Sequence, residues 1–474
     1  MDYCRRSNPF VFCRLVWDAP VNNSSYFAKV WFVFSLTVLA FGYGFASHAW
    51  ELFPKGYVER AWRQGYWLVQ DRSVQDQNPA ITFNTPRYDR HGTRIPKPEQ
   101  VQPGLTLITS SWEGPDGWNP ALRLFDSQGE MVHEWRLDRE KVFQGESFKR
   151  IDPRRQYIHG SYFLTGGDLV ANLTRAGMVK LDACSNILWE LKEKTHHSIA
   201  RKKDGSFWVP RNNLKEVPSN DQYPGGFPGL EEKKITTRQI INVSKRGKIL
   251  ERIRVLNIIY RSRLKRYIPK SLGSVKDSLL ADLTHLNDVE PLDPSMSDEY
   301  PLFQAGDLLV SLRNLDLVFV FNPTTKEVKW HSSDPFIFQH DPDFIGDGWI
   351  GVFDNNYDLS GGELLGGSRI VALQPHTDSV EVKFPTERSE PFYTRVAGKW
   401  QLLDNGNLLL AESTQGRVVE VNPSGETVWE WIHEPIDSSA VPGVSKATRL
   451  DLTREEVASW PCSSVDSVGS SSKK

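Results

Sequence analysis

The chain has 474 residues, of which 39% are hydrophobic and 11% aromatic, enough to bury a large core in one repeat domain or two ordinary ones. Its formal net charge is −2, and no block of lysine and arginine interleaves with aromatic residues, so the sequence predicts no nucleic-acid partner. Sixteen tryptophans beside four methionines suit β-strands, because large flat side chains pack well on a pleated surface.

Residues 30–50 contain no Asp, Glu, Lys or Arg. Because about 20 apolar helical residues cross the hydrocarbon layer, we predict a transmembrane helix over residues 29–50. A buried core helix usually keeps a polar stripe, and a cleaved signal peptide ends in a small-residue site that is not evident here. The basic residues before the span favour a cytoplasmic segment over residues 1–28, which places the rest of the chain outside the cytoplasm, in the periplasm if the host is bacterial.

Residues 51–102 are polar and proline-rich, and we expect a juxtamembrane segment followed by a linker. Residues 453–474 are expected to form a disordered tail. The four cysteines imply no disulfide framework. A bridge between Cys184 and Cys462 stays an open alternative, because nothing in the sequence places them close together.

The most informative feature of the sequence is an internal repeat of a strand, a turn, a second strand, a polar turn and a third strand ending in tryptophan. Three clear copies occupy residues 166–191, 305–332 and 405–432, and three weaker ones lie at 121–137, 204–253 and 347–384. Repeated units of this kind close into a propeller, so we predict an all-β fold: a six-bladed β-propeller over residues 103–452, preceded by one N-terminal transmembrane helix. A pair of β-sandwiches is disfavoured, because sandwich strands do not recur as copies of one unit.

Histidines recur at one position of this repeat, the start of the strand that should line the central channel. His159, His197 and His340 each precede the glycine of their turn by eight positions, and Gly398 takes this place in the last repeat. His285 begins the matching strand of the remaining blade, where an insert lengthens the spacing. If the blades close into a ring, we expect these histidines to meet at one end of the channel.

Convergent imidazoles can bind a metal, shuttle protons, or act as nucleophile and anion stabilisers. Duplication of a structural histidine would give the same register without a function. A metal site is the rival hypothesis, which the lack of a recurring companion carboxylate weakens slightly. Arg313, in the second strand of the His285 blade, adds a cationic guanidinium whose N–H donors suit a tetrahedral oxyanion.

The motifs THHSI, DLTHLNDVE, LVSLRNLD and FQHDPDF, the last followed by GVFDNN, resemble the corresponding blades of bacterial arylsulfotransferases over residues 158–434. The resemblance implies transfer of a sulfuryl group from an aryl sulfate to a phenol through a transiently sulfated histidine, with no nucleotide donor or other cofactor. By motif match it assigns the sulfated histidine to His340 and the contacts to the sulfate oxygens to His197, His285 and Arg313. Further candidate substrate-binding residues are His159, His196, Asn287, Asn314, Asp354 and Asn355.

Two functions therefore remain open at this point. One is a membrane-tethered aryl sulfotransferase, and the other is a non-catalytic extracytoplasmic propeller that binds a ligand or a protein. His196 and His197 compete for the same place in the site. The sequence indicates nothing about the oligomeric state.

Overall fold

The computed structural model describes residues 23–49, 83–114, 117–137, 141–143, 157–174, 176–215, 234–269, 280–436 and 440–462. The chain divides into two compact units, Met1–Tyr66 and Trp67–Lys474. Residues 1–22 of the expected cytoplasmic segment and residues 51–82 of the expected juxtamembrane segment lie outside the described residues, as does the end of the tail from residue 463.

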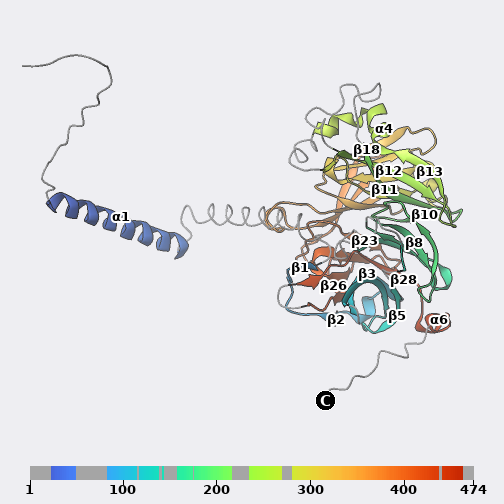
Figure 1. Ribbon diagram of the computed structural model, residues 1–474, viewed down its shortest axis with the longest axis horizontal. Coiled ribbons are helices and arrows are strands. Elements are labelled where there is room, and N and C mark those ends of the chain that lie inside the picture. Colours follow the sequence, from blue (N-terminus) through green and yellow to red (C-terminus); the bar gives the residue numbers. More distant parts are fainter. Residues whose placement is uncertain are drawn as a thin grey trace, which may run out of the picture. The chain divides into compact units, whose positions relative to one another are not determined.

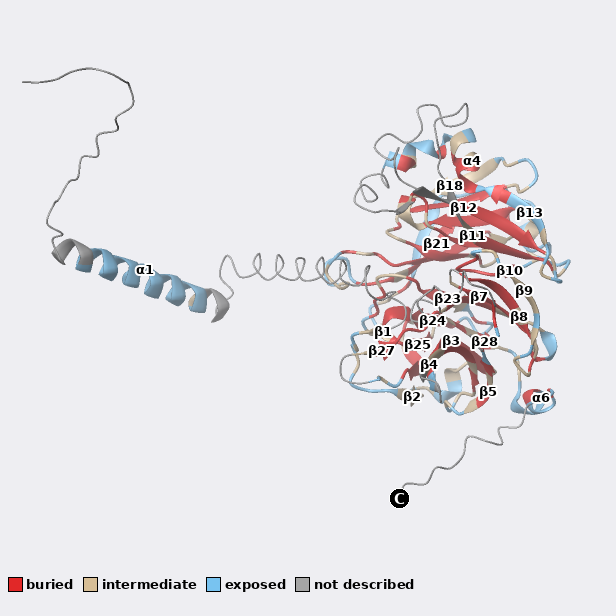
Figure 2. Ribbon diagram, viewed as in Figure 1, coloured by how far each residue is buried: buried red, intermediate tan, exposed pale blue. Residues whose placement is uncertain are grey.

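In the first unit, helix α1 (Asn23–Ala49) carries the apolar segment (Figure 1). Its residues Phe27–Ala46 have a mean hydropathy of 1.5, and Figure 2 shows the helix as exposed. By length and composition this helix could cross a membrane. A signal sequence near an N-terminus would meet the same criterion.

The second unit is the six-bladed propeller that the repeats predict, built from six antiparallel sheets that we number as blades 1 to 6. Blade 1 comprises β6 (Ile158–Phe163), β7 (Leu169–Leu173), β8 (Gly177–Leu181) and β9 (Ile187–Leu191). Blade 2 comprises β10 (Ala200–Arg201), β11 (Phe207–Lys215), β12 (Lys234–Val243) and β13 (Ile249–Arg254), with β14 (Leu280–Asp282) parallel to β12. Blade 3 comprises β15 (Leu286–Pro291), β16 (Leu308–Leu312), β17 (Leu317–Phe321) and β18 (Val328–Ser332).

Blade 4 comprises β19 (His340–Phe344), β20 (Ile350–Asp354), β21 (Arg369–Gln374) and β22 (Ser379–Phe384). Blade 5 comprises β23 (Lys399–Leu402), β24 (Leu408–Glu412), β25 (Arg417–Val421) and β26 (Thr427–Ile432). Blade 6 comprises β28 (Lys446–Leu450), β3 (Leu105–Gly114), β4 (Gly117–Phe125) and β5 (Met131–Arg136). Helix α4 (Val255–Arg261) follows blade 2 and packs against its core.

Blade 6 closes the ring, because its strands come from both ends of the propeller. Strand β28 from the C-terminal end pairs with β3 from the N-terminal end, with Lys446 opposite Thr109 and Leu450 opposite Leu105. In each blade the first strand is the innermost. The second and third strands are largely buried because each blade is packed between two others, as Figure 2 shows for β7 and β8 of blade 1.

Part of the expected linker belongs to the propeller. Strand β2 (Gly92–Arg94) adds a fifth strand to blade 5, and β1 (Phe83–Asn84) pairs with β27 (Val441–Pro442). Arg94 forms an ion pair with the buried Glu430 at 2.6 Å. The sequence could not reveal these contacts because the basic residues and their acidic partners are more than 300 positions apart.

The expected tail is ordered up to residue 462, so the prediction of a disordered segment from residue 453 is wrong for its first part. Helix α6 (Arg454–Ala458) begins at a capping box formed by Thr453 and Glu456, and Trp460 packs against Trp135. Cys184 and Cys462 form a disulfide with their Cα atoms 5.3 Å apart. No local sequence pattern favours this bridge, because 278 positions separate the two cysteines.

We expect the double variant Cys184→Ser/Cys462→Ser to have a free energy of unfolding about 2–4 kcal/mol below that of the wild type, because the bridge restricts the unfolded chain. Urea denaturation followed by tryptophan fluorescence measures this difference. Wild-type protein treated with a reductant is the control and should match the variant. Equal transition midpoints for variant and oxidised wild type would contradict the expectation.

Candidate functional site

The innermost strands of the blades begin at the same end of the channel, and the four register histidines lie at these starts. The ring of His197 lies 3.7 Å from that of His159, 5.2 Å from that of His285 and 6.3 Å from that of His340, measured between ring centroids. The structure therefore brings together the four histidines that the sequence places in register. We call them the histidine cluster.

His197, and not His196, occupies the centre of the cluster. The His196 ring contacts His197, with their Nδ1 atoms 2.5 Å apart, and its Nε2 atom accepts a hydrogen bond from Arg238 at 2.7 Å. His196 is thus held between a cation and the cluster, and both of its ring nitrogens have protein partners.

The backbone at the start of the innermost strands is unusual. His197 has φ of 55° and His285 has φ of 46°, in the left-handed region that non-glycine residues seldom adopt. Gly160 in blade 1 allows the close approach of this segment, because a Cβ atom there would lie 1.9 Å from the His197 carbonyl oxygen. Such uncommon backbone conformations persist only where surrounding contacts hold them, and they concentrate at functional sites.

Three buried asparagines supply such contacts between neighbouring blades. Each donates from Nδ2 to a backbone carbonyl at or next to the register position of a following blade: Asn172 to His197 (3.2 Å), Asn287 to Gln339 (2.8 Å) and Asn355 to Ala397 (2.8 Å). We call these three residues the amide clamps. Two of them, Asn287 and Asn355, are among the predicted substrate-binding residues, and their Nδ2 atoms are used to join blades.

Asn355 also orients the imidazole of His340. Its Oδ1 atom lies 2.6 Å from His340 Nδ1, and the Phe338 carbonyl lies 3.0 Å from the same nitrogen. Because both partners are oxygen atoms that accept, His340 carries its proton on Nδ1 in the neutral form. The lone pair is therefore on Nε2, which is the tautomer a nucleophilic histidine needs at that atom.

Arg313 lies beside the cluster on the turn after β16. Its guanidinium donates to Asn314 Oδ1 at 3.2 and 3.3 Å and lies over the Phe338 ring, with 5.5 Å from Cζ to the ring centroid. Asn314 in turn donates to the Asp282 carbonyl at 2.6 Å. Asn314 therefore positions the arginine.

Asp354, the remaining predicted substrate-binding residue, serves the fold within blade 4. It forms an ion pair with Arg369 at 2.5 Å and accepts a hydrogen bond from the Ile337 backbone at 2.8 Å. Its carboxylate thus fixes the segment that leads to His340.

Burial and nearby cations keep the histidines neutral. Burial, followed by the charge of Arg313, lowers the pKa of His340 well below the ordinary value and lowers the pKa of His285 to about 4. Burial, together with neighbouring imidazoles, also lowers the pKa of His197 and His159 well below the ordinary value. At neutral pH the cluster therefore consists of uncharged imidazoles beside a fixed guanidinium.

The sequence analysis missed two residues that complete the site, Arg238 and Asp282. Asp282 accepts a hydrogen bond from His285 Nδ1 at 2.8 Å and is paired with Arg238. Asp282 is three positions before His285 in the motif DLTHLNDVE, a signal that could have indicated it. Arg238 has no comparable signal, because it is distant in the sequence from every histidine of the cluster.

A second polar network follows the histidine cluster along the channel. The buried Lys399 of β23 pairs with Asp288 of β15 at 2.5 Å and with Asp341 of β19. Burial raises the pKa of Asp288 to about 6. Further ionisable side chains of the innermost strands are Glu290, Asp343 and Lys446, and burial with the neighbouring acids raises the pKa of Glu290 to about 8. The alternation of acids in NDVE and HDPDF could have indicated this network, because residues two apart share one face of a strand.

We expect Lys399→Met to lower the free energy of unfolding by about 3 kcal/mol, because it leaves two buried carboxylates without their cation. Urea denaturation measures the loss. The double variant Asp288→Asn/Lys399→Met should recover part of it, because one of the unpaired charges is then absent. A Lys399→Met protein as stable as the wild type would show that the carboxylates do not depend on the ammonium.

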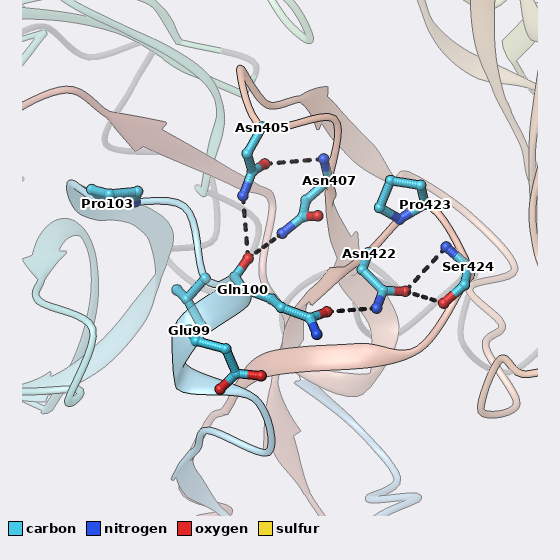
Figure 3. A pocket seen from close by; sticks show the side chains of 9 residues that line it. Glu99, Gln100, Pro103, Asn405, Asn407, Asn422, Pro423 and Ser424 are labelled. Carbon is cyan, nitrogen blue, oxygen red and sulfur yellow. Dashed lines mark hydrogen bonds between the residues drawn. The ribbon is translucent and has the colours of Figure 1, made fainter.

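Two surface cavities lie outside the histidine cluster. The first, of about 640 Å³, lies between the turns of blade 5 and η1 (Pro98–Gln100). Figure 3 shows that its asparagines hold the N-terminal connector: Asn405 and Asn407 donate to the Gln100 carbonyl, and Asn422 donates to the Gln100 side chain. The second, of about 500 Å³, is lined by Trp112, Trp118 and His433.

Among the residues that the structure describes, no three His, Cys, Asp or Glu side chains are arranged to hold a metal ion.

Solved structures with a similar arrangement include a protein of unknown function from Bacteroides caccae (12% identity, 72% of this chain and 99% of that one, TM-score 0.45). Another is a catalytically inactive virginiamycin B lyase from Staphylococcus aureus with quinupristin (13% identity, 60% and 73%, TM-score 0.34). A nidogen/laminin complex also matches (9% identity, 72% and 100%, TM-score 0.39).

No curated protein sequence matches the chain significantly. The family model described as arylsulfotransferase (ASST) matches residues 160–434, which is more than half of the chain and includes His197, His285, Arg313 and His340. The chain therefore belongs to the arylsulfotransferase family.

Proposed function

We propose that the protein is a membrane-anchored, extracytoplasmic aryl sulfotransferase that moves a sulfuryl group from an aryl sulfate to a phenol through a sulfohistidine at His340. The observation that carries this proposal is the tautomer of His340, whose Nδ1 proton is held by two oxygen acceptors so that Nε2 bears the lone pair. Three further imidazoles and the Arg313 guanidinium surround this nucleophile.

In the first half-reaction, His340 Nε2 attacks the sulfur of the aryl sulfate, the new N–S bond forms, and the S–O bond to the aryl group breaks. Sulfuryl transfer, like phosphoryl transfer, is expected to need in-line positioning and charge stabilisation more than covalent assistance. Arg313 and His197 supply donors for the sulfuryl oxygens. The departing phenolate takes a proton from water, because His285 is unprotonated at neutral pH.

In the second half-reaction, the oxygen of the acceptor phenol attacks the sulfur, the N–S bond breaks, and His340 returns to its starting form. The phenol proton passes to His285 Nε2, and this imidazolium is paired with Asp282. His285 then releases this proton to water, which replaces the proton that the departing phenolate took. Protons and charges balance over one cycle without a nucleotide or a further cofactor.

Two aromatic side chains at the cluster fit an aryl substrate. The half-buried rings of Phe338 and Tyr357 meet edge to face, with centroids 5.2 Å apart, and Arg313 lies over Phe338. Phe338 has φ of 57°, and its backbone N–H donates to Asp316 at 2.8 Å. We infer that these rings form one wall of the aryl-binding site, next to the cation that binds the sulfate.

Two features support the proposed cellular location. A structural disulfide such as Cys184–Cys462 forms in oxidising compartments, which supports an extracytoplasmic propeller. Helix α1 would then serve as the anchor. Both substrates are small molecules that reach the mouth of the channel from solution or from the membrane surface.

We expect the purified protein to release one equivalent of phenol rapidly from a chromogenic aryl sulfate when no acceptor is present, and to yield a sulfated peptide that contains His340. His340→Asn should abolish both the burst and the labelled peptide. His91→Asn, at an exposed histidine outside the cluster, is the matched control and should retain them. Identical behaviour of the wild type and His340→Asn across several donors and acceptors would favour a non-catalytic binding propeller.

The lowered histidine pKa values predict an unusual pH profile. A nucleophile with an ordinary histidine pKa would lose activity as the pH falls through about 6.5. Because the pKa of His340 lies well below the ordinary value and its Nε2 atom stays unprotonated, we expect kcat/KM for phenol release to remain level through pH 6.5 and to fall only at a lower pH. Initial rates with a donor whose ionisation lies outside this range test the prediction, and a half-maximal rate near pH 6.5 would contradict it.

A further inference from the structure

Arg238 and Asp282 form an ion pair that touches the histidine cluster from two sides. Arg238 Nε lies 3.1 Å from Asp282 Oδ1, and a second hydrogen bond joins the Nη2 and Oδ2 atoms. Arg238 is buried in β12, and the parallel pairing of β12 with β14 places Thr236 opposite Asp282. The two residues of the ion pair therefore lie on paired strands of one sheet, which holds them near each other.

On the first side, the arginine determines where two histidines carry their protons. A guanidinium only donates, so His196 Nε2 must accept the hydrogen bond from Arg238 at 2.7 Å. The neutral His196 ring then carries its proton on Nδ1 and donates it to His197 Nδ1 at 2.5 Å. Because His197 Nδ1 accepts, the proton of neutral His197 is on Nε2.

On the second side, the carboxylate determines the tautomer of His285. An ionised carboxylate only accepts, so His285 Nδ1 donates to Asp282 Oδ2 at 2.8 Å, and the His285 backbone N–H donates to Oδ1 at 3.0 Å. Burial raises the pKa of Asp282, but Arg238 and His285 outweigh it and keep the carboxylate ionised. The Nε2 atom of neutral His285 therefore bears the lone pair.

We propose that the Arg238–Asp282 ion pair is a positioning element that holds His197 and His285 in opposite tautomers, with His197 donating and His285 accepting at Nε2. This inference rests on the proposed function for the reaction that it serves. During sulfuryl transfer, His197 Nε2–H would donate to a sulfuryl oxygen, and His285 Nε2 would take the proton of the acceptor phenol. One ion pair thus gives two chemically identical side chains different roles.

The tautomers can be measured without reference to activity. Full-length protein labelled with ¹⁵N-histidine, in detergent at neutral pH, should show His197 protonated at Nε2 and His285 protonated at Nδ1 in long-range ¹H–¹⁵N spectra. His197→Asn and His285→Asn variants assign the signals. The opposite tautomer at either ring of the wild type would overturn the proposal.

Kinetics then test the consequence for the reaction. Asp282→Asn should lower kcat for transfer to a phenol about 100-fold with little change in KM, because the proton acceptor is no longer fixed. Arg238→Gln should lower the rate of donor cleavage by about 10-fold or more, because His197 is no longer held as a donor, and Arg238→Lys should restore part of it.

Arg211→Gln is the matched control. Arg211 lies on the neighbouring strand β11 and forms an ion pair with Glu193, and its side chain contacts no histidine of the cluster. This variant should leave both rates unchanged. Wild-type rates in Asp282→Asn and Arg238→Gln would also overturn the proposal. If the wild type shows the expected tautomers but transfers no sulfuryl group, the ion pair keeps its positioning role and the proposed function fails alone.

Discussion

Ring closure is the constraint on which the site depends. Strand β28 brings the C-terminal end of the propeller against β3, so the six innermost strands surround one channel and begin at the same end of it. A side chain at the first position of an innermost strand therefore faces the corresponding side chains of the other blades. Duplication of a blade that carried one histidine there would therefore produce a cluster of histidines. No separate long-range signal in the sequence would be needed to bring them together.

Closure alone does not give the cluster its chemistry, because the rings must also be oriented. The amide clamps join three of the register positions to a neighbouring blade, and Asn355 connects this structural role to the site by holding His340 through its other amide atom. The same side chain therefore stabilises a blade contact and selects a tautomer. Left-handed backbone is tolerated at His197, where Asn172 donates to the carbonyl oxygen, and at His285, whose N–H donates to Asp282 and whose carbonyl oxygen accepts from the Arg313 N–H.

The sequence predicted what repeats and local motifs encode: six blades, the register of the histidines and the apolar helix. It did not predict contacts between distant parts of the chain, such as Cys184 with Cys462 or Arg94 with Glu430, because nothing local records them. The choice between His196 and His197 depended on a left-handed turn that places one ring in the channel and the other against Arg238. Asn287 and Asp354 were predicted as substrate-binding residues, and in the structure their side chains bond to backbone groups and to Arg369, so a motif can also preserve contacts within and between blades.

The polar side chains change in kind along the channel. At the mouth, neutral imidazoles lie beside the guanidiniums of Arg313 and Arg238, and Asp288, Glu290, Asp341 and Asp343 follow farther along the same innermost strands. Lys399 pairs with Asp288 and Asp341, and burial with the neighbouring acids raises the pKa of Glu290 and Asp343, so these acids add little net negative charge. A sulfate monoester would therefore be attracted to the Arg313 cation at the mouth, beside the histidine cluster. Because burial leaves the imidazoles uncharged, the fixed cations and hydrogen-bond donors, and not titrating histidines, would provide the attraction. Anion binding and nucleophilic attack could then occur at the same pH, which a cluster of protonated histidines would not allow.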